Sequence, residues 1–414
     1  MSVKRFLFFP LLLFIFFSVN SQSYDSLQVS LLTVSPHSRA VWTIFGHTAL
    51  RLHDPVRKID AVCNWGTFDF GQPNFILHFI EGKTDYFLSA SNFESVMHEH
   101  ADERATVTEQ ILNIPENEKG PLLESLQFNL LPENSEYRYN FIFDNCTTRP
   151  HDFIERFCGG TIIYPEQRQA VTFRRLIHQC TRLYPWLEAG IDCVIGSGAD
   201  SLISFRNELF LPEKLMDALN RSVVKHPDGS EQPIVLTTEV ILQSPDSQPE
   251  RLNFWYHPLT IGWILFIFYL ALSITAYYKY HKKSNRLSAF TFQLLPFTLL
   301  FLVAGAGGCI VFMLNFFSLH PCVQSNWNLL WLHPLHFIAV AGFFSRKSYR
   351  LIRWYHAANF VLLSCFLLGW HWIPQELNRV FIPFILCLWV VSGLNWVYRY
   401  CEGDSSKGKS KKSD

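Results

Sequence analysis

The chain has 414 residues, of which 49% are hydrophobic and 17% charged, with 35 Lys and Arg against 35 Asp and Glu. This composition is too apolar for a disordered chain and too neutral for a nucleic-acid-binding protein. Ten cysteines are far fewer than a small disulfide-stapled fold uses, so the fold must rest on its own core or on lipid.

Residues 1–21 have the pattern of a secretory signal peptide. Lys4 and Arg5 precede an apolar run from Phe6 to Val19, and small residues follow. An uncleaved N-terminal anchor is the alternative, although this run is shorter than the roughly 20 residues that span a bilayer. Under either interpretation the segment that follows is exported.

Residues 22–234 are predicted to form the exported catalytic domain. Alternating apolar patterns typical of strands are separated by helical patterns, in an order that favours an α+β fold over a regular parallel βαβ series. The expected strands are 27–34, 47–53, 59–68, 106–112 and 137–143, and the expected helices are 74–80, 93–101 and 118–130.

Cys146 is the most informative residue in this domain. We expect a strand to end at Cys146 and a helix to begin beside it, with Thr147 or Thr148 as the N-cap. A helix N-terminus favours a thiolate, and Arg149 adds positive charge. Unpaired N–H groups of Cys146 and Thr147 are the predicted donors to an oxyanion.

A thiolate nucleophile needs a base, and His47 is the best candidate. Gly46 permits a close backbone approach just before it. The imidazole in turn needs an orienting acceptor. Asn64 and Asp69 rank above Asp54 for this role, and the sequence does not separate the first two.

Two alternatives would remove this chemistry. A lone cysteine is more often an inert, buried apolar residue, and Cys146 could instead form a disulfide with Cys158. Cys180 and Cys193 could also pair with each other. Against a passive role, an unpaired thiol outside the cytoplasm tends to be oxidised unless it has a partner or a use.

The last part of the chain is predicted to cross a membrane. Residues 235–257 are expected to form a juxtamembrane linker, residues 258–398 a five-helix domain and residues 399–414 a basic cytoplasmic tail. Two loops and the tail carry four, four and five basic residues, whereas the alternate loops hold only Arg379. This asymmetry places the exported domain outside. The five apolar stretches are 259–278, 288–319, 329–344, 354–373 and 380–397.

A polar loop between two of these stretches could lie near the site. His320, Asn326 and Asn328 are hypothesised to contact a lipid headgroup or a lipoprotein terminus; an ordinary Trp-anchored turn is the alternative. The pair His98 and His100 lacks a convincing third ligand, so neither a metal nor a cofactor is predicted.

Three stretches resemble one known family: Gly46-His47-Thr48-x-Leu50-Arg51, Asn64-Trp65-Gly66-x-Phe68-Asp69-Phe70 and Asn140-x-x-x-Asp144-Asn145-Cys146-Thr147-Thr148-Arg149. They resemble the Lnb N-terminal periplasmic domain family of Bacteroidota, over roughly residues 25–230. The order, histidine first and cysteine later, is similar to the circularly permuted NlpC/P60 papain-like group, which includes lecithin retinol acyltransferase.

The resemblance implies a papain-like α+β exported domain followed by an all-α five-helix transmembrane bundle. Relatives of this type are lipoprotein N-acyltransferases. Carried over to this chain, Cys146 is the nucleophile and His47 its base, and the third catalytic residue is not fixed by the match. A membrane-helix C-terminal half is also typical of the family.

The expected enzyme moves an acyl chain from a phospholipid, through a cysteine thioester, to the α-amine of a diacylated lipoprotein. Membrane helices favour this reading, since extracting lipid into water costs ~0.8 kcal/mol per CH₂. Arg149 and Thr147 are expected to help bind substrate, and the expected location is the cytoplasmic (inner) membrane with the catalytic domain in the periplasm.

A membrane-anchored NlpC/P60-type cysteine peptidase or amidase acting on peptidoglycan is the alternative. A third class is a non-catalytic envelope scaffold, in which Cys146 is buried or disulfide-bonded.

Overall fold

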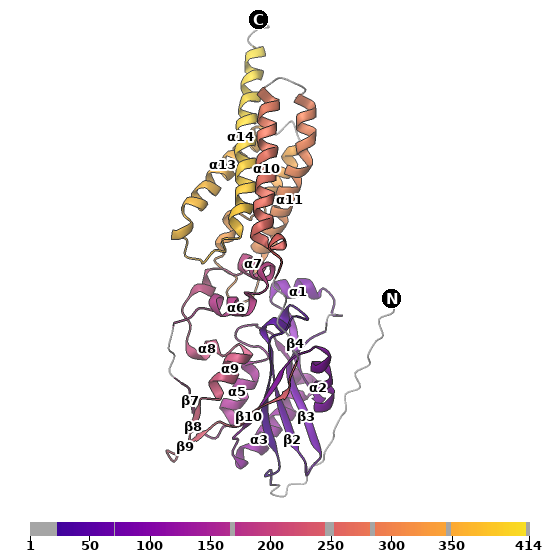
Figure 1. Cartoon of the computed structure of the whole chain (residues 1–414), viewed down its shortest axis with the longest axis vertical. Helices are drawn as coiled ribbons and strands as arrows, with labels where there is room; N and C mark the ends of the chain where they lie inside the picture. Colours follow the sequence, from indigo (N-terminus) through magenta and orange to yellow (C-terminus); the bar gives the residue numbers. More distant parts are fainter. Residues whose placement is uncertain are drawn as a thin grey trace.

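The computed structural model describes residues 23–69, 71–165, 170–244, 252–281, 286–344 and 349–410. Figure 1 shows a sheet-containing domain at one end of the long axis and a helical bundle at the other. The predicted signal segment, residues 1–21, lies outside the described residues.

An antiparallel seven-stranded sheet forms the centre of the first domain. Its strand order is β10-β5-β1-β2-β3-β4-β6, so strands distant in sequence pair at both edges. The strands are β1 Gln28–Val34, β2 His47–Asp54, β3 Ile59–Thr67, β4 Asp85–Asn92, β5 Val107–Leu112, β6 Glu136–Arg138 and β10 Val235–Leu242.

Helices cover both faces of this sheet. On one face, alternate residues of β1, β2 and β3 form the main core with α3 (Glu116–Leu130), α5 (Thr148–Phe157) and α9 (Pro212–Leu219). Trp65 of β3 lies against Phe153 of α5, with ring centroids 5.2 Å apart. The other face packs on α2 (Phe93–Asp102). Because side chains alternate along a strand, both faces of β1 are buried.

A second layer lies between the main sheet and the bundle. It contains α6 and α7, whose apolar residues join a separate core with Phe210 and Leu211. The remaining elements of the first domain are α1 Phe75–Glu81, α4 Pro132–Ser135, α6 Phe173–Thr181, α7 Pro185–Val194, α8 Phe205–Glu208 and a small sheet of β7 Thr161–Ile163, β8 Val223–Lys225 and β9 Glu231–Pro233.

Four of the five expected strands and all three expected helices are confirmed, within one or two residues at each end. Residues 137–143 are different. Only the first two continue β6, and Asn140 then pairs with Asp144 across a tight turn in which the Asn140 side chain accepts N–H bonds from Ile142 and Phe143. The expected strand ending at Cys146 is therefore wrong.

The expected linker also begins in the wrong place. Residues 235–242 form β10, which pairs with β5 and adds an edge strand to the main sheet. Their Thr and Val content is typical of strands, and two register shifts mark them as an irregular edge. The chain therefore leaves this domain only after residue 242.

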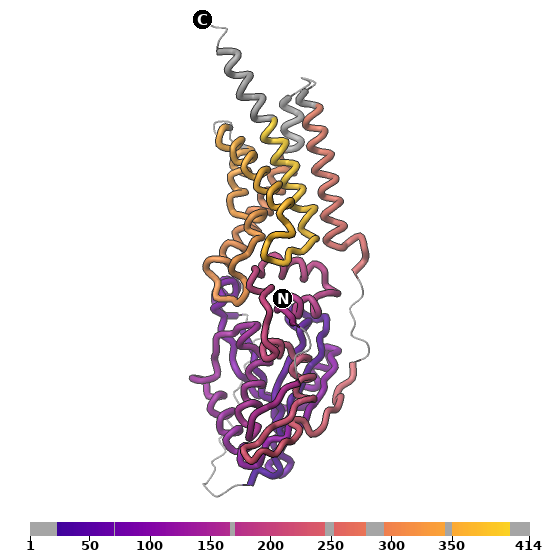
Figure 2. The backbone as a smooth tube through the Cα atoms, turned by 90° about the vertical axis from the view of Figure 1, so that its left-hand side faces the viewer, coloured from indigo at the N-terminus to yellow at the C-terminus, as the bar shows by residue number. Residues whose placement is uncertain are grey.

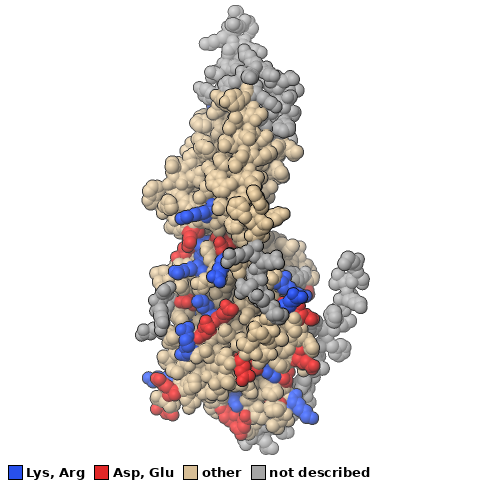
Figure 3. Space-filling view, in the orientation of Figure 1, with Lys and Arg blue, Asp and Glu red and all other residues tan. Residues whose placement is uncertain are grey.

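In the part of the second domain that the structure describes, there are five largely apolar helices, α10 Pro258–His281, α11 Arg286–Phe317, α12 His336–Phe344, α13 Tyr349–Leu368 and α14 Phe381–Ser410. Among the described residues, three of them are long and apolar enough to cross a membrane: α10, α11 and α13. The apolar part of α14, Phe381–Val397, is shorter. On the face shown in Figure 3, the described part of this bundle has almost no charged side chains, whereas Lys, Arg, Asp and Glu are scattered over the first domain.

The third expected stretch, 329–344, is helical only in part. A short 3-10 turn, Trp327–Leu330, precedes it, and α12 begins at His336, two residues after Pro334. Proline lacks the N–H that a continuous helix would need there. At 1.5 Å per residue, the nine described residues of α12 are roughly 14 Å long, which is less than a bilayer's apolar thickness.

Candidate active site

The β2–β3 hairpin brings His47 and Asn64 together. The two strands pair antiparallel in the register Leu50↔Cys63, which places the start of β2 beside the end of β3. His47 Nε2 and Asn64 Oδ1 are 2.7 Å apart, so the amide oxygen accepts the ring N–H and leaves Nδ1 for the thiol. Of the three candidates that the sequence offered, Asn64 is therefore the one that hydrogen-bonds this imidazole.

Two glycines permit close contacts beside the site, Gly46 with β1 and Gly66 with Cys146. Gly46 has φ +76°, and a Cβ there would lie 2.8 Å from the Val34 carbonyl oxygen. Gly66 has φ +101°, and its Cβ would lie 3.3 Å from Cys146 Cβ. A side chain at Gly66 would press on the sulfur-bearing residue and strain the backbone.

Cys146 precedes α5, but neither Thr147 nor Thr148 caps this helix. The buried Asn145 does so, because its Oδ1 accepts the N–H groups of Thr147 and Thr148 at 2.8 and 2.9 Å. Its amide nitrogen donates to the carbonyls of Phe141 and Phe210. Asn145 thereby fixes the loop that carries the thiol.

This cap also changes the expected oxyanion site. The Thr147 N–H is engaged by Asn145, so the prediction that it is an unpaired donor is wrong. Within the described residues, the N–H of Cys146 donates to no protein acceptor. The Thr147 side chain is buried, and its hydroxyl lies 3.3 Å from the Thr48 hydroxyl and 3.9 Å from Cys146 Sγ, so it ties the start of α5 to β2 and to the sulfur.

The thiol and the imidazole favour their charged forms. Partial burial acts to raise the pKa of Cys146, but the charge and hydrogen bond of His47, with donors from Thr147 and the Thr48 backbone, lower it below the ordinary value. Burial acts to lower the pKa of His47, but Cys146 and Asn64 raise it above the ordinary value. The pair therefore favours a thiolate beside an imidazolium.

Aromatic rings form one wall of the site. Tyr86 and Tyr139 stack with ring centroids 4.1 Å apart. Burial, with the charge of the Cys146 thiolate, raises the pKa of Tyr86 to about 12. Both hydroxyls therefore stay protonated beside the thiolate at neutral pH.

Arg149 lies on the same side of the site, but its charge is already compensated. Its guanidinium forms a two-pronged ion pair with Asp144, with Nη2 2.7 Å from Oδ2, and lies 4.1 Å above the Tyr137 ring. The side chain braces the loop before Cys146.

Two expected acidic partners of His47 lie elsewhere. Asp69 is exposed beyond the end of β3, and its carboxylate accepts the Gly71 N–H at 2.7 Å. Asp54 is at the far end of β2, where it binds Arg57 and Ser26. The structure brings neither to the imidazole.

The cysteines named as disulfide partners are free. Cys146 and Cys158 are not bonded, and Cys158 Sγ lies 3.3 Å from the carbonyls of Glu155 and Gly160. Cys180 and Cys193 are also unpaired, so both disulfide alternatives are wrong.

The loop residues His320, Asn326 and Asn328 hold the two domains together. Asn328 is fully buried and donates to the carbonyls of Asp192 and Cys193, and Asn326 also donates to Cys193. His320 donates to the Phe79 carbonyl. The structure gives these three side chains contacts with the first domain in place of the expected contacts with a headgroup, and Asn326 and Asn328 are buried against the end of α7.

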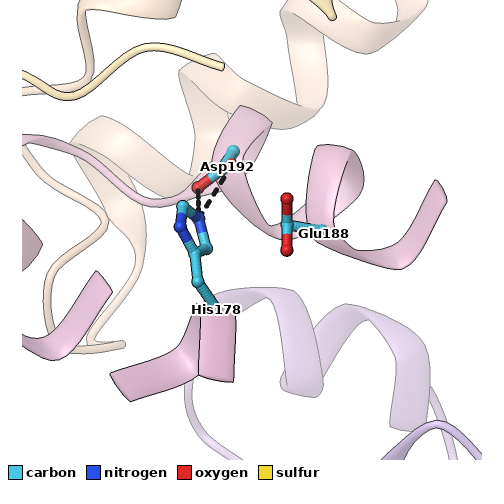
Figure 4. A group of neighbouring side chains, drawn as sticks. All are labelled: His178, Glu188 and Asp192. Atoms are coloured by element: carbon cyan, nitrogen blue, oxygen red, sulfur yellow. Dashed lines mark hydrogen bonds and ion pairs between the residues drawn. The ribbon is translucent and has the colours of Figure 1, made fainter. Parts of the chain in front are cut away.

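One further cluster has metal-ligating side chains. His178, Glu188 and Asp192 lie on α6 and α7, with His178 directed at Asp192 (Figure 4). Asp192 is buried, and its two oxygens already accept bonds from Arg174, His178 and Asn378 at 2.7 to 3.0 Å. A carboxylate so occupied is a poor metal ligand, and the cluster is better explained as an ion-pair network.

Comparisons with known proteins connect both domains to one family. The model of the Lnb N-terminal periplasmic domain matches residues 17–179, and that of the Lnb transmembrane domain matches residues 250–402. No curated protein and no solved structure matches the chain.

Proposed function

We propose that this chain is a cysteine-dependent acyltransferase that completes lipoprotein acylation. The chain belongs to the Lnb family and is a membrane protein with a periplasmic domain. Membership of this family points to a membrane enzyme that modifies lipoproteins. The proposed donor is a phospholipid, and the proposed acceptor is the α-amine of a diacylglyceryl-cysteine at a lipoprotein N-terminus. The proposed location is the inner membrane.

The observation that carries this proposal is the arrangement of Cys146, His47 and Asn64. These residues lie in a domain that is followed by a bundle of apolar helices. A thiolate beside an oriented imidazolium is suited to acyl transfer through a covalent intermediate. The helices keep the catalyst at the membrane, so neither lipid substrate needs to be extracted into water.

In the first half-reaction, the Cys146 thiolate attacks an ester carbonyl of the phospholipid. The N–H of Cys146 is the proposed donor to the oxyanion. When the tetrahedral intermediate collapses, the ester C–O bond breaks and His47 gives its Nδ1 proton to the leaving alkoxide. The products are a lysophospholipid and an acyl-thioester on Cys146, with a neutral imidazole.

In the second half-reaction, the lipoprotein α-amine attacks the thioester. Neutral His47 takes a proton from the attacking nitrogen, the C–S bond breaks, and the thiolate–imidazolium pair returns. The acceptor leaves as an amide. Asn64 keeps the imidazole in the tautomer that both steps need, since its Oδ1 accepts a hydrogen bond from the Nε2–H throughout.

The test is intact-mass analysis of the full-length protein after incubation with phospholipid vesicles and acid quench. We expect a mass gain of one acyl chain, mapped to Cys146, that is discharged by a diacylated lipopeptide with a free α-amine but not by its N-acetylated form. Cys146→Ala should gain no acyl chain, whereas the matched variant Cys180→Ala should behave like the parent protein.

Absence of the acyl-thioester, together with lipid-independent cleavage of muropeptides by the same preparation, would show instead a peptidase acting on peptidoglycan. Complementation provides the cellular readout. A strain carrying Cys146→Ser should accumulate diacylated lipoproteins, and the parent gene should restore the N-acylated form.

A further inference from the structure

Helix α1, Phe75–Glu81, is unusual because its apolar side chains face outward. The exposed fractions are 75% for Ile76, 49% for Leu77 and 47% for Phe79. No residue of this helix is buried. Its side chains surround a shallow hollow of about 610 Å³ lined by Gln72, Asn74, Phe75, Ile76, Leu77 and Ile80. An aqueous surface does not stabilise such a cluster.

The membrane domain holds α1 at its C-terminal end. Three consecutive carbonyls of the last turn accept hydrogen bonds from the loop that follows α11: Phe79 from His320, Ile80 from the Ser318 hydroxyl and Glu81 from the Leu319 N–H. Figures 1 and 2 both show α1 at the edge of the first domain nearest to the bundle. The helix therefore lies at the same level along the molecule as the C-terminal end of α11.

The exposed apolar surface continues from α1 onto α11. Phe316, Phe317 and Leu319 are 60%, 59% and 62% exposed. Phe316 and Phe317 end the longest of the candidate membrane spans, Leu294–Phe317, whose exposed side chains would face lipid, and Leu319 follows in the next loop. The surface of α1 is thus an extension of a lipid-facing surface.

Aromatic rings connect α1 with the wall of the Cys146 site. Phe68 lies two residues beyond Gly66, which abuts Cys146, and stacks on Phe75 of α1. Centroid separations along the row are 4.1 Å for Tyr139 and Tyr86, 4.9 Å for Tyr86 and Phe68, 5.8 Å for Phe68 and Phe75, and 6.4 Å for Phe75 and Phe79.

We propose that α1 is seated in the lipid leaflet next to the first domain, and that the aromatic row leads a phospholipid acyl chain from this leaflet to Cys146. The route of the acyl chain to Cys146 rests on the proposed function, whereas the position of α1 in the leaflet does not. The occupant of the apolar surface is the bilayer, because the surface continues that of α11 and is bonded to the loop at its end.

The first experiment measures where α1 lies, without catalysis. Benzoylphenylalanine replaces Ile76 in the full-length Cys146→Ala protein, in nanodiscs of phosphatidylethanolamine and phosphatidylglycerol, and irradiation products are analysed by mass. Val56 is the matched control site, since it is 77% exposed in the β2–β3 turn, at the opposite end of β2 from His47. Phospholipid adducts at position 76 but not at position 56 are expected; equal adducts at both sites would overturn the seating of α1.

The second experiment measures the route. In the protein with Cys146 intact, Ile76→Asp and Leu77→Asp should slow thioester formation from bilayer phospholipid by about tenfold, as expected when an apolar contact of this size is lost. Val56→Asp should match the parent rate. Parent-like rates for both α1 variants would overturn the route. Lipid adducts at position 76 without any thioester in the parent protein would overturn the proposed function and the route together, while supporting the seating of α1.

Discussion

At the scale of single residues, Asn64 adds to the basicity of His47, after the larger effects of burial, which lowers the pKa of His47, and of Cys146, which raises it. Cys146 and His47 each shift the pKa of the other toward the thiolate–imidazolium pair, so the acylation rate should rise as Cys146 loses its proton and fall as His47 loses its proton. Asn64 acts on the pKa of His47 and not on that of Cys146, because it hydrogen-bonds the imidazole and not the sulfur. Its variants therefore separate the two limbs of the pH profile.

Asn64→Ala removes a hydrogen bond that raises the pKa of His47, so this pKa should fall and the alkaline limb should move to lower pH. Asn64→Asp places a carboxylate at the same nitrogen and should move the alkaline limb to higher pH. The acid limb, which reports Cys146, should move much less. Rates of thioester formation between pH 5 and 10 give the profile, and an alkaline limb that is the same in all three proteins would contradict the role of Asn64.

Gly66 lies on β3 close to Cys146. Gly66→Ala introduces a Cβ 3.3 Å from Cys146 Cβ at φ +101°, so we expect a loss of about 1 kcal/mol or more in stability. A small displacement of the thiol should also lower the acylation rate by ~100-fold. Gly190→Ala is the control, because a Cβ there meets nothing within 4 Å and α7 is helical at that position. Thermal unfolding and single-turnover acylation test both effects; equal behaviour of the two variants would argue against a site role for Gly66.

Cys146 and His47 could be predicted from sequence because each stands beside a recognisable backbone signal, a helix start and a glycine before a strand. Asn64 and Asp69 could not be separated, since the choice depends on where β3 ends. The strand ends at Thr67, which leaves Asp69 in solvent. The sequence does not reveal the cap at Asn145, because a threonine follows Cys146 directly and is the better-placed cap by position alone.

At the scale of elements, the start of α5 depends on one side chain. Asn145→Ala leaves the N–H groups of Thr147 and Thr148 without their acceptor, and should cost about 1–2 kcal/mol. The freed Thr147 N–H and the displaced loop should also reduce acylation. The control is Thr172→Ala, because Thr172 caps α6 through the Arg175 N–H.

Both cap variants should lower the unfolding temperature, but only Asn145→Ala should lower the rate of thioester formation per folded molecule. Full activity in Asn145→Ala, measured at a temperature where it is folded, would show that the cap does not position the thiol.

Strands with strong alternation were predicted from sequence, and those defined by distant partners were not. β4 follows α1 with the mixed sequence Asp85–Asn92, and β10 has strand-forming Thr and Val residues but no alternation of buried and exposed side chains. Each becomes a strand because a neighbouring strand, β3 or β5, offers unpaired backbone groups. Pairing between segments that are distant in sequence cannot be predicted from either segment alone.

At the scale of the whole molecule, the two domains are joined by buried polar groups. Arg174 is fully buried and pairs with Asp192 and Asp200. The same carboxylates bond the loop between α13 and α14, through the Asn378 side chain and the Glu376 N–H. The sequence could not reveal this junction, because each partner is an ordinary polar residue in its own segment.

Removing one charge from this junction should loosen the joint between the domains. Asp192→Asn leaves the buried Arg174 with Asp200 as its only carboxylate, and should cost about 3 kcal/mol. The bond to His178 also loses its charge, so the pKa of this histidine, which Asp192 raises against the effect of burial, should fall. Glu188→Gln is the control, because it makes the same charge change on the same helix at a partly exposed site.

Hydrogen exchange of the full-length protein in nanodiscs measures the joint directly. Residues 192–200 and 320–330 should exchange faster in Asp192→Asn than in Glu188→Gln, while β1 to β3 keep their protection. Because α1 is held by the loop at 318–320, the same variant should also slow acylation from bilayer phospholipid. Unchanged exchange at the joint with slowed acylation would assign Asp192 to the reaction itself, and unchanged exchange with full activity would show that the remaining contacts suffice to hold the two domains together.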